Sequence, residues 1–420
     1  MSAMKNYKQT ELGLLPEDWE VKRLGEIANI IMGQSPPGES YNTLRKGIPL
    51  INGPTEFTKK FPIKKQWTTQ PTKMCKKDDL LLCVRGSSTG RTNTSNDNYC
   101  IGRGVAAIRA TKNSDIIFLT NHVYLAIEKI LSLSSGSTFP NIDRKSLTTI
   151  PIPVPPLAEQ KAIAKVLSDT DALIQSTEKL IAKKKLIKKG AMQELLTGKK
   201  RLGSFPKGKT VGREQTELGH LPEDWEVKEL GEVCEKIIDG THHTPTYVKQ
   251  GVPFYSVENI TLKNFRNTKF ISEEEHLRLI KRCKPMQGDI LMTRITAGIL
   301  GDTKLIDWDV YASIYVSLAI LRTNSNILTS YLYRYSKSSN FIKSIEKRSL
   351  INATPKKINM QDIRKVPIPL PPLPEQKAIA EVLSNMDAEI EALEKKLQKQ
   401  KQIKQGMMQE LLTGRMRLID

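Results

Sequence analysis

The residues that come nearest to a catalytic motif are Gly203-Ser-Phe-Pro-Lys-Gly-Lys-Thr210, which match the phosphate-binding loop pattern G-x-x-x-x-G-K-T. In such a loop a buried strand precedes the glycines and a helix follows them, so that backbone amides converge on the phosphates. Here Pro206 lies inside the pattern, and the preceding residues end an expected helix. We therefore predict a basic linker that does not bind ATP.

Other residue types suited to catalysis or metal binding lack the necessary spacing. His242 and His243 are adjacent, and neighbouring side chains point in different directions, so we expect a loop that makes polar contacts and holds no metal. The sequence contains no Asp/Asn-Pro-Pro-Tyr/Phe methyltransferase motif, no glycine-rich loop suited to S-adenosylmethionine and no carboxylate-x-Lys nuclease core. We predict a chain with no catalytic residues, metal or cofactor of its own.

Composition points to a multidomain globular protein whose first partner to test is nucleic acid. The 420 residues are 39% hydrophobic, which gives each of two to four domains a core. The 65 Lys and Arg against 45 Asp and Glu leave a net charge of +20, an excess that favours a polyanionic partner. The five cysteines form no C-x-x-C pair, which fits a reducing cytoplasm. We expect neither secretion nor a membrane span, because no apolar run approaches eighteen residues.

Two internal repeats decide the organisation of the chain. Thr10-Glu-Leu-Gly-Leu-Leu-Pro-Glu-Asp-Trp-Glu-Val-Lys-Arg-Leu-Gly-Glu26 returns almost unchanged from Thr216 to Glu232, a displacement of 206 residues. Pro151-Ile-Pro-Val-Pro-Pro-Leu-Ala-Glu-Gln-Lys-Ala-Ile-Ala164 returns from Pro367, a displacement of 216, and both copies run on to Leu-Leu-Thr-Gly. Between the repeated parts lie two variable segments that have diverged, the second longer by the ten residues that separate the two displacements. Repeated segments that are alike, around variable segments that differ, predict that the two halves of the chain perform the same function on two different targets.

The second repeated part predicts a long helix in each copy. After the proline run, strong helix formers continue without interruption, and apolar residues recur at spacings of four and three, the seam of a coiled coil. We expect the two helices to pack on each other, antiparallel if a twofold axis relates the repeats. The seam residues are Ile163, Leu167, Ile174, Ile181, Ile379, Leu383, Met386, Ile390, Leu393 and Leu397.

The variable segments have the pattern of mixed α/β domains. Short apolar runs bounded by Gly, Asp, Asn and Ser predict strands, and two longer stretches have helical composition. The strands are expected at 80–84, 105–108, 290–292 and 316–321, and the helices at 116–131 and 328–345. The predicted fold is α+β, with two mixed α/β domains joined by two long helices in an antiparallel coiled coil with internal pseudo-twofold symmetry.

This arrangement resembles the specificity subunit of Type I restriction-modification enzymes over almost the whole chain. The resemblance rests on the duplicated Leu-Pro-x-x-Trp, at Leu15 to Trp19 and Leu221 to Trp225, and on the duplicated Ile-Pro-x-Pro-Pro-Leu-x-Glu-Gln. It rests also on the duplicated Leu-Leu-Thr-Gly and on the order of these motifs around two variable segments.

The resemblance implies that each variable segment is a target recognition domain that reads half of a split DNA site. The helix pair would set the spacer and dock two modification subunits, which bind S-adenosylmethionine and methylate adenine, while separate restriction subunits use ATP and Mg to translocate and cut DNA. The expected segments are 1–156 and 216–372 for the recognition domains, 157–198 and 373–414 for the helices, 199–215 for a basic linker and 415–420 for the tail.

Base contacts require polar side chains on loops that reach the major groove. Three loops in each variable segment qualify, at similar places relative to the repeats, although polar loops are more often simple turns. The candidate DNA-contacting residues are Gln34, Ser35, Tyr41, Arg85, Arg91, Asn141, Arg144, Lys145, Thr241, His242, His243, Thr244, Tyr247, Arg294, Asn352, Lys356 and Lys357. We expect Trp19 and Trp225 to anchor the repeated segments to the domain cores, and Lys183–Lys189 to be a solvated or subunit-facing helix surface.

Two alternatives stay open at the level of sequence. A coiled-coil scaffold whose variable domains bind protein would explain the helices and the repeats but gives the positive charge no use. A self-contained restriction-methylation enzyme would need a divergent catalytic site, which the missing methyltransferase motif argues against.

Overall fold

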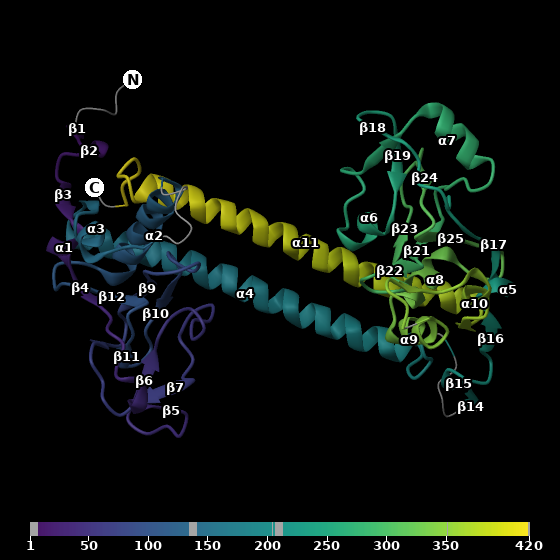
Figure 1. Cartoon of the computed structure of the whole chain (residues 1–420), viewed down its shortest axis with the longest axis horizontal. Coiled ribbons are helices and arrows are strands. Elements are labelled where there is room, and N and C mark those ends of the chain that lie inside the picture. Colours follow the sequence, from purple (N-terminus) through teal and green to yellow (C-terminus); the bar gives the residue numbers. More distant parts are fainter. Residues whose placement is uncertain (1–6, 134–140, 204, 206–212, 351, 419–420) are drawn as a thin grey trace. The chain divides into compact units, whose positions relative to one another are not determined.

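The structure, a computed structural model, describes residues 7–133, 141–203, 205, 213–350 and 352–418. The chain divides into two compact units. Unit 1 holds the residues up to Glu178 and those from Lys395 onward, and unit 2 holds Lys179–Glu394. Two helices of 39 residues, α4 (Leu157–Leu195) and α11 (Leu373–Leu411), each contribute to both units (Figure 1). Their bounds lie within the predicted helical segments. Gly208, Lys209 and Thr210 of the rejected phosphate-loop pattern fall outside the described residues.

Unit 1 contains a β-rich domain that precedes α4. Its helical segments are α1 (Leu24–Ile27), η1 (Gly38–Ser40), α2 (Ile116–Leu133) and α3 (Arg144–Thr148). Its strands are β1 (Tyr7–Thr10), β2 (Gly13–Pro16), β3 (Glu20–Arg23), β4 (Ala28–Met32), β5 (Tyr41–Asn42), β6 (Ile48–Ile51), β7 (Gln66–Thr68), β8 (Met74–Cys75), β9 (Leu80–Cys83), β10 (Thr92–Thr94), β11 (Tyr99–Ile101), β12 (Val105–Ala110) and β13 (Pro151–Val154).

Two stacked sheets form the core of unit 1. The inner sheet has the order β10-β9-β12-β4, and the outer sheet has the order β5-β7-β6-β11-β8. Leu80 and Leu82 of β9 pack toward α2 and the long helices, whereas Leu81 and Cys83 pack toward the outer sheet. Successive side chains of a strand point to opposite faces, so a strand covered on both faces must be apolar throughout. This explains the uninterrupted Leu-Leu-Leu-Cys run.

Unit 2 repeats this plan in the second half of the chain. Its helices are α5 (Leu230–Val233), α6 (Val257–Thr261), α7 (Glu273–Ile280), α8 (Thr329–Ser336), α9 (Ser339–Lys347) and α10 (Met360–Arg364). Its strands are β14 (Arg213–Thr216), β15 (Gly219–Pro222), β16 (Glu226–Glu229), β17 (Cys234–Asp239), β18 (Tyr247–Val248), β19 (Val252–Tyr255), β20 (Lys269–Ile271), β21 (Ile290–Thr293), β22 (Ile295–Thr296), β23 (Thr303–Leu305), β24 (Ser313–Ile314), β25 (Leu318–Thr323), β26 (Lys356–Lys357) and β27 (Pro367–Leu370).

The inner sheet of unit 2 has the order β23-β21-β25-β17, which matches the inner sheet of unit 1 strand for strand. Its outer sheet is β18-β20-β19-β24. All four predicted strand runs are strands, but the single helical stretch expected at 328–345 is two helices. The Ser338 hydroxyl accepts a hydrogen bond from the Phe341 amide and begins a new helix, because a serine at this position satisfies an amide that has no carbonyl partner.

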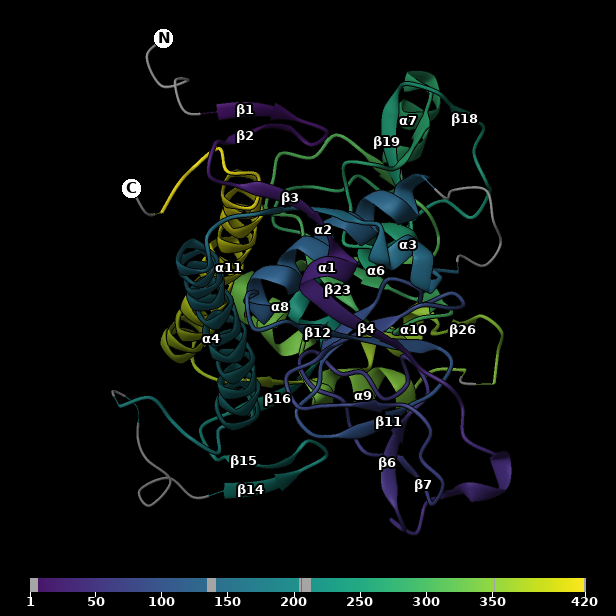
Figure 2. The ribbon, with the colours of Figure 1, turned by 90° about the vertical axis from the view of Figure 1, so that its left-hand side faces the viewer.

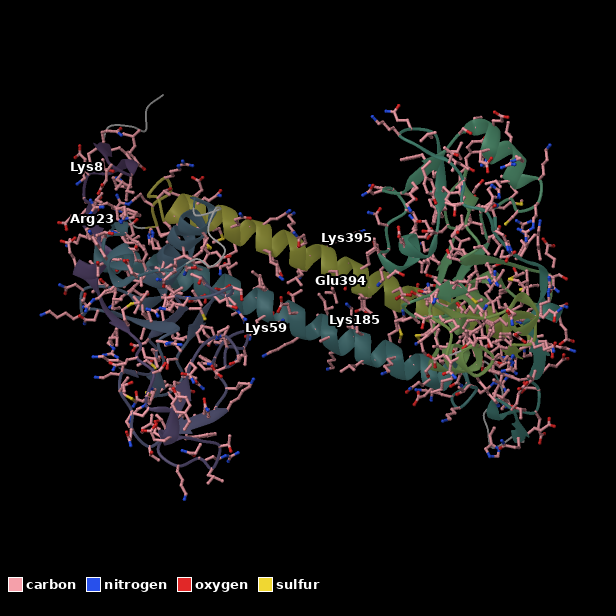
Figure 3. The ribbon with its side chains drawn as sticks, in the orientation of Figure 1. Lys8, Arg23, Lys59, Lys185, Glu394 and Lys395 are labelled. Atoms are coloured by element: carbon pink, nitrogen blue, oxygen red, sulfur yellow. The ribbon has the colours of Figure 1, made fainter. Side chains whose placement is uncertain are left out.

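Within each unit one end of α4 lies against the opposite end of α11. In unit 1, Glu178 pairs with Lys401 at 3.0 Å and Asp171 with Lys404 at 2.7 Å. In unit 2, Glu394 pairs with Lys185 at 2.6 Å, and Asp387 pairs with Lys188. Figure 3 shows the Lys185 and Glu394 side chains extending from α4 and α11 toward each other. The residue numbers fall on one helix as they rise on the other, so the paired segments run antiparallel in each unit.

The predicted seam residues are all at least half-buried. Ile163, Leu167 and Ile181 on α4, like Ile379, Leu383 and Ile390 on α11, are less than one tenth exposed. The other four are half-buried, namely Ile174, Met386, Leu393 and Leu397. The apolar stripe of each helix therefore faces protein, as its spacing predicts.

Candidate nucleic-acid interface

Four side chains brought together from the repeated motifs form a cluster around the buried Trp19 and Glu159 in unit 1. The Trp19 indole Nε1 donates to Glu159 Oε2 at 3.0 Å. Arg417 contacts both oxygens of Glu159, at 2.7 and 2.8 Å, and both oxygens of Asp18. These bonds raise the pKa of Arg417 above its ordinary range, since both partners are anions. We call Asp18, Trp19, Glu159 and Arg417 the neck cluster of unit 1.

Unit 2 builds the same neck cluster from Asp224, Trp225, Glu375 and Arg201. Trp225 Nε1 donates to Glu375 at 3.0 Å, and Arg201 contacts both Glu375 and Asp224. Burial disfavours the charge of Arg201, but the hydrogen bonds to Asp224 and Glu375 outweigh it and raise its pKa. Both tryptophans are buried, as their predicted anchoring role requires.

The neck cluster explains why three separate motifs recur together. In each unit the Trp comes from the Leu-Pro-Glu-Asp-Trp segment, the Glu from the start of one long helix and the Arg from the residues after the other long helix. Gly414 (φ 69°) precedes Arg417, and a Cβ there would lie 2.6 Å from the Pro16 ring, so only glycine fits. Tyr7 of β1 also donates to the Gly414 carbonyl at 3.0 Å, and Figure 2 shows the β1–β2 hairpin beside the end of α11.

The structure brings three predicted DNA-contacting loops of unit 1 together at the end of the inner sheet. The Ser35 hydroxyl accepts from the Arg103 amide at 3.3 Å, and the Val84 amide donates to the Gly104 carbonyl at 2.9 Å. Ile142 in turn donates to Val84, and Arg85 bridges to Asn141. Of the candidates here, Gln34, Arg85, Arg91, Asn141, Arg144 and Lys145 are exposed and Ser35 is half-buried. Tyr41 lies apart from this group, on β5 of the outer sheet.

The corresponding loops of unit 2 meet in the same way. Val316 donates to the Thr241 carbonyl, Arg294 donates to Ser317, and Ile358 donates to Arg294. The strand pair β22–β26 joins Ile295 to Lys357. His242, His243, Thr244, Tyr247, Asn352, Lys356 and Lys357 are exposed, whereas Thr241 and Arg294 are buried. The exposed members of both groups therefore satisfy the first requirement of a DNA contact.

Arg294 departs from its expected place, and we do not retain it as a base-contacting candidate. Its guanidinium lies 2.6 Å from Asp239 and donates to the Val316 carbonyl, and burial lowers its pKa. Arg294 corresponds to Val84, one residue before Arg85, because the carbonyls of Arg294 and Val84 both accept from the first residue after their loop, Ile358 and Ile142. A shift of one residue along a strand turns a side chain to the other face.

Asp239 is the centre of a charge cluster that the repeats do not predict. It is buried and receives Arg294 at 2.6 Å, Arg282 at 2.5 Å and His242 at 2.9 Å. Burial disfavours the carboxylate, but these partners hold its pKa below the ordinary value. Asp239 lies opposite Ala319 in the sheet, and its counterpart in unit 1, opposite Ala106, is Met32. Since only one repeat carries the charges, repeat comparison gave no signal for Asp239 or Arg282.

The family model "Type I restriction modification DNA specificity domain" matches residues 16–185 and 222–405. The chain belongs to the family of Type I restriction enzyme specificity subunits. It is 30% identical to the MjaVIII specificity subunit of Methanocaldococcus jannaschii, an alignment that covers 99% of this chain and 96% of the relative. It is 41% identical to the MjaX specificity subunit of the same organism, an alignment that covers about half of each chain (47%).

Structural comparison gives the same fold. The S subunit of the Type I restriction-modification system from M. genitalium superimposes with a TM-score of 0.58, covering 98% of both chains at 17% sequence identity. Membership in the family gives the chain its place in a restriction-modification system and implies DNA binding. Within the described residues, no helix is long and apolar enough to cross a membrane, and no group of His, Cys, Asp and Glu is arranged to hold a metal ion.

Proposed function

We propose that this chain is the sequence-specific DNA-binding subunit of a Type I restriction-modification complex, and that each unit reads one half of a bipartite, asymmetric DNA site. One observation carries the proposal: the neck clusters and inner sheets of the two units match, whereas the loops at the end of each inner sheet differ. Two units with the same neck cluster and inner sheet but different loops are suited to recognising two half-sites of different sequence.

The loops have the chemistry that base readout requires. Arg85, Arg91 and Asn141 in unit 1 and Lys356 and Lys357 in unit 2 are exposed donors on loops that meet. Arginine and asparagine side chains recognise base edges in the major groove, and lysines also bind phosphates. The net charge of +20 favours association with DNA and makes it dependent on salt.

We assign the long helices to spacing and assembly. An antiparallel coiled coil of α4 and α11, with a pseudo-twofold relation between the units, would fix the distance between the half-sites. Four large apolar side chains of α4 stay exposed: Leu173, Leu180, Leu186 and Ile187. Exposed apolar residues along a helix suit a protein partner, and we assign them to the docking of two modification subunits.

In this assignment the chain supplies specificity and no catalytic step. S-adenosylmethionine belongs to the modification subunits, and ATP and Mg belong to the restriction subunits. The chain's own residues position the DNA and the partners, and we place the complex in the cytoplasm.

Selection from randomised duplexes tests the proposal. The chain, alone and with its modification subunits, is incubated with the pool at physiological salt, and the bound duplexes are sequenced. We expect a split motif with two unlike halves. Substitution of Arg85 by Ala should relax one half, and substitution of Lys357 by Ala should affect only the other.

A different result of the same selection would contradict the proposal. Salt-sensitive binding without an enriched motif, with the partners present, would leave only phosphate attraction and would favour a scaffold whose variable domains bind protein. Arg23→Ala is a suitable control, because this exposed arginine, labelled in Figure 3, pairs with Glu11 and is not one of the candidate DNA-contacting residues. It should leave the selected motif unchanged.

A further inference from the structure

Unit 2 contains a pocket of about 640 Å³ beside the loop that carries His242 and His243. Helix α7 and the residues after it form one wall, and β24 of the outer sheet contributes another. The lining residues are Thr241, His242, His243, Arg278, Leu279, Arg282, Cys283, Ser313 and Ile314.

The pocket arises from an insertion that unit 1 lacks. Thr68 ends β7 and Ile271 ends β20, a displacement of 203, whereas Asp79 and Asp289 before the next inner strands are displaced by 210. The seven extra residues contain most of α7, which supplies Arg278. The histidines are specific to unit 2 as well, because Ser35 and Pro36 stand at the corresponding positions of unit 1. The helix and the histidines that line this pocket are therefore specific to unit 2 among the described residues.

Two arginines of the pocket are held in place by carboxylates. Arg278 pairs with Glu275 at 2.6 Å, and Arg282 pairs with Asp239 and donates to the Asp239 and Gly240 carbonyls. Their side chains are still 64% and 51% exposed, so both reach the solvent at the mouth of the pocket.

These arginines keep unused hydrogen-bond donors. Within the part of the chain that the structure describes, Nε and Nη1 of Arg278 and Nε of Arg282 have no acceptor. Asp239 also binds the buried Arg294, so Arg282 shares this carboxylate with a second arginine. Arg278 therefore keeps two unused donors and Arg282 keeps one beside the same pocket, and charged donors from two guanidinium groups suit an oxyanion such as phosphate.

We infer that this pocket binds a phosphate of the DNA backbone next to the half-site that unit 2 reads, with Arg278 and Arg282 as its ligands. The inference rests on the proposed function and deepens it. A phosphate contact fixes the register of the domain on the duplex and carries no sequence information itself. With the domain fixed in one position along the duplex, the neighbouring exposed loops contact the same base pairs in every complex.

The first experiment compares Arg278→Gln with the matched control Lys281→Gln. Both remove one positive charge near the end of α7, but Lys281 does not line the pocket. With the modification subunits present, Arg278→Gln should weaken binding about tenfold. It should reduce the slope of log affinity against log salt by about 0.9, the value for one phosphate, without changing the selected motif. Lys281→Gln should change the affinity less than threefold, and equal melting temperatures establish that both variants fold.

The second experiment locates the phosphate. Each phosphate around the second half-site is replaced in turn by an uncharged methylphosphonate. We expect one position to weaken wild-type binding about tenfold and to have no further effect on the Arg278→Gln, Arg282→Gln double variant, since the contact is already absent.

Three results would overturn the inference. Wild-type affinity and salt slope in the double variant would mean that the pocket does not contact DNA. A reduced slope without any coupled methylphosphonate position would mean that the pocket takes only free anions. A methylphosphonate effect that persists in full in the double variant would place that phosphate elsewhere. Failure of the proposed function is a different result, namely that the wild-type complex selects no split motif.

Discussion

Unit 1 and unit 2 share their neck clusters and the strand order of their inner sheets, but they carry a different pair of side chains at the end of that sheet. Met32 and Val84 occupy this place in unit 1, whereas Asp239 and Arg294 form an ion pair there in unit 2. An apolar pair and an ion pair therefore occupy the same backbone frame. The neck cluster stabilises the shared backbone fold, so the side chains at the end of the inner sheet can differ between the units.

The cost of this difference is expected to be small when the pair is complete and large when it is broken. Buried charges lose their hydration, and their mutual attraction only roughly compensates for it, whereas a lone buried charge is uncompensated. Asp239 pairs with His242, Arg282 and Arg294, so its contribution to the stability of unit 2 includes more than the contact with Arg294.

The largest effect is expected from Asp239→Met. This change leaves Arg294 buried without its carboxylate and should destabilise unit 2 by about 3–5 kcal/mol. The double variant Asp239→Met, Arg294→Val restores the residues of unit 1 and should recover most of the loss. The stability losses of the single and the double variant are measured by urea unfolding, with hydrogen exchange of the amides in β17 and β21 as the probe. A double variant no more stable than Asp239→Met would refute the equivalence of the two pairs.

The neck clusters should respond unequally to the same substitution. Arg201 is 3% exposed and Arg417 is 29% exposed, so water can replace a lost carboxylate only for Arg417. Glu375→Gln should cost unit 2 about 2 kcal/mol, and Glu159→Gln should cost unit 1 about half as much. Hydrogen exchange in each unit gives these values, with the exposed Glu381→Gln on α11 as a control near zero. Equal losses would show that burial does not set the strength of this cluster.

Acid should weaken the ion pair of Glu178 selectively. Lys401 and Lys59 bond to Glu178 and lower its pKa from 4.5, so its contribution is present above the ordinary pKa and disappears as the pH falls through the lowered value. Wild-type unit 1 should exceed Glu178→Gln in stability by less than about 1 kcal/mol near neutral pH, because the pair is partly exposed. Urea unfolding should show this gap closing below the ordinary pKa. A gap independent of pH would contradict the assignment.

The smallest effect is expected at the counterpart pair in unit 2. Lys185 and Glu394 are about half exposed, so Lys185→Ala should change the stability of unit 2 by about 0–0.5 kcal/mol. Lys401→Ala in unit 1 is the matched comparison. High salt should remove any difference that urea unfolding detects, because exposed charges are screened. A loss above 1 kcal/mol that persists in salt would assign these lysines a packing role.

The repeats predicted the frame of the fold because they contain the residues that build it. The motifs around Trp19, Glu159 and their copies recur since each unit needs the same neck, and the seam follows from apolar spacing alone. The break at Lys337–Ser338 was missed because the composition of this stretch is helical and only the Ser338 hydroxyl interrupts it.

The candidate site was less predictable for a physical reason. Arg85 and Arg294 lie in matching stretches of the two halves but one position apart, and this difference of one residue along the chain exposes the first and buries the second. The first repeat carries Met32 in place of Asp239 and gives no match for Arg278 or Arg282, and contacts between distant segments alone bring these three charged residues together. Sequence repeats reveal what two units share and say little about where they differ.

The central claim is that each unit reads its own half-site within a common frame. It is tested most directly by a chain in which residues 234–366 are replaced by residues 28–150, so that both frames carry the first variable segment. Selection from randomised duplexes, with the modification subunits present, should then recover two inverted copies of one half-site. Recovery of the original asymmetric motif would contradict the account.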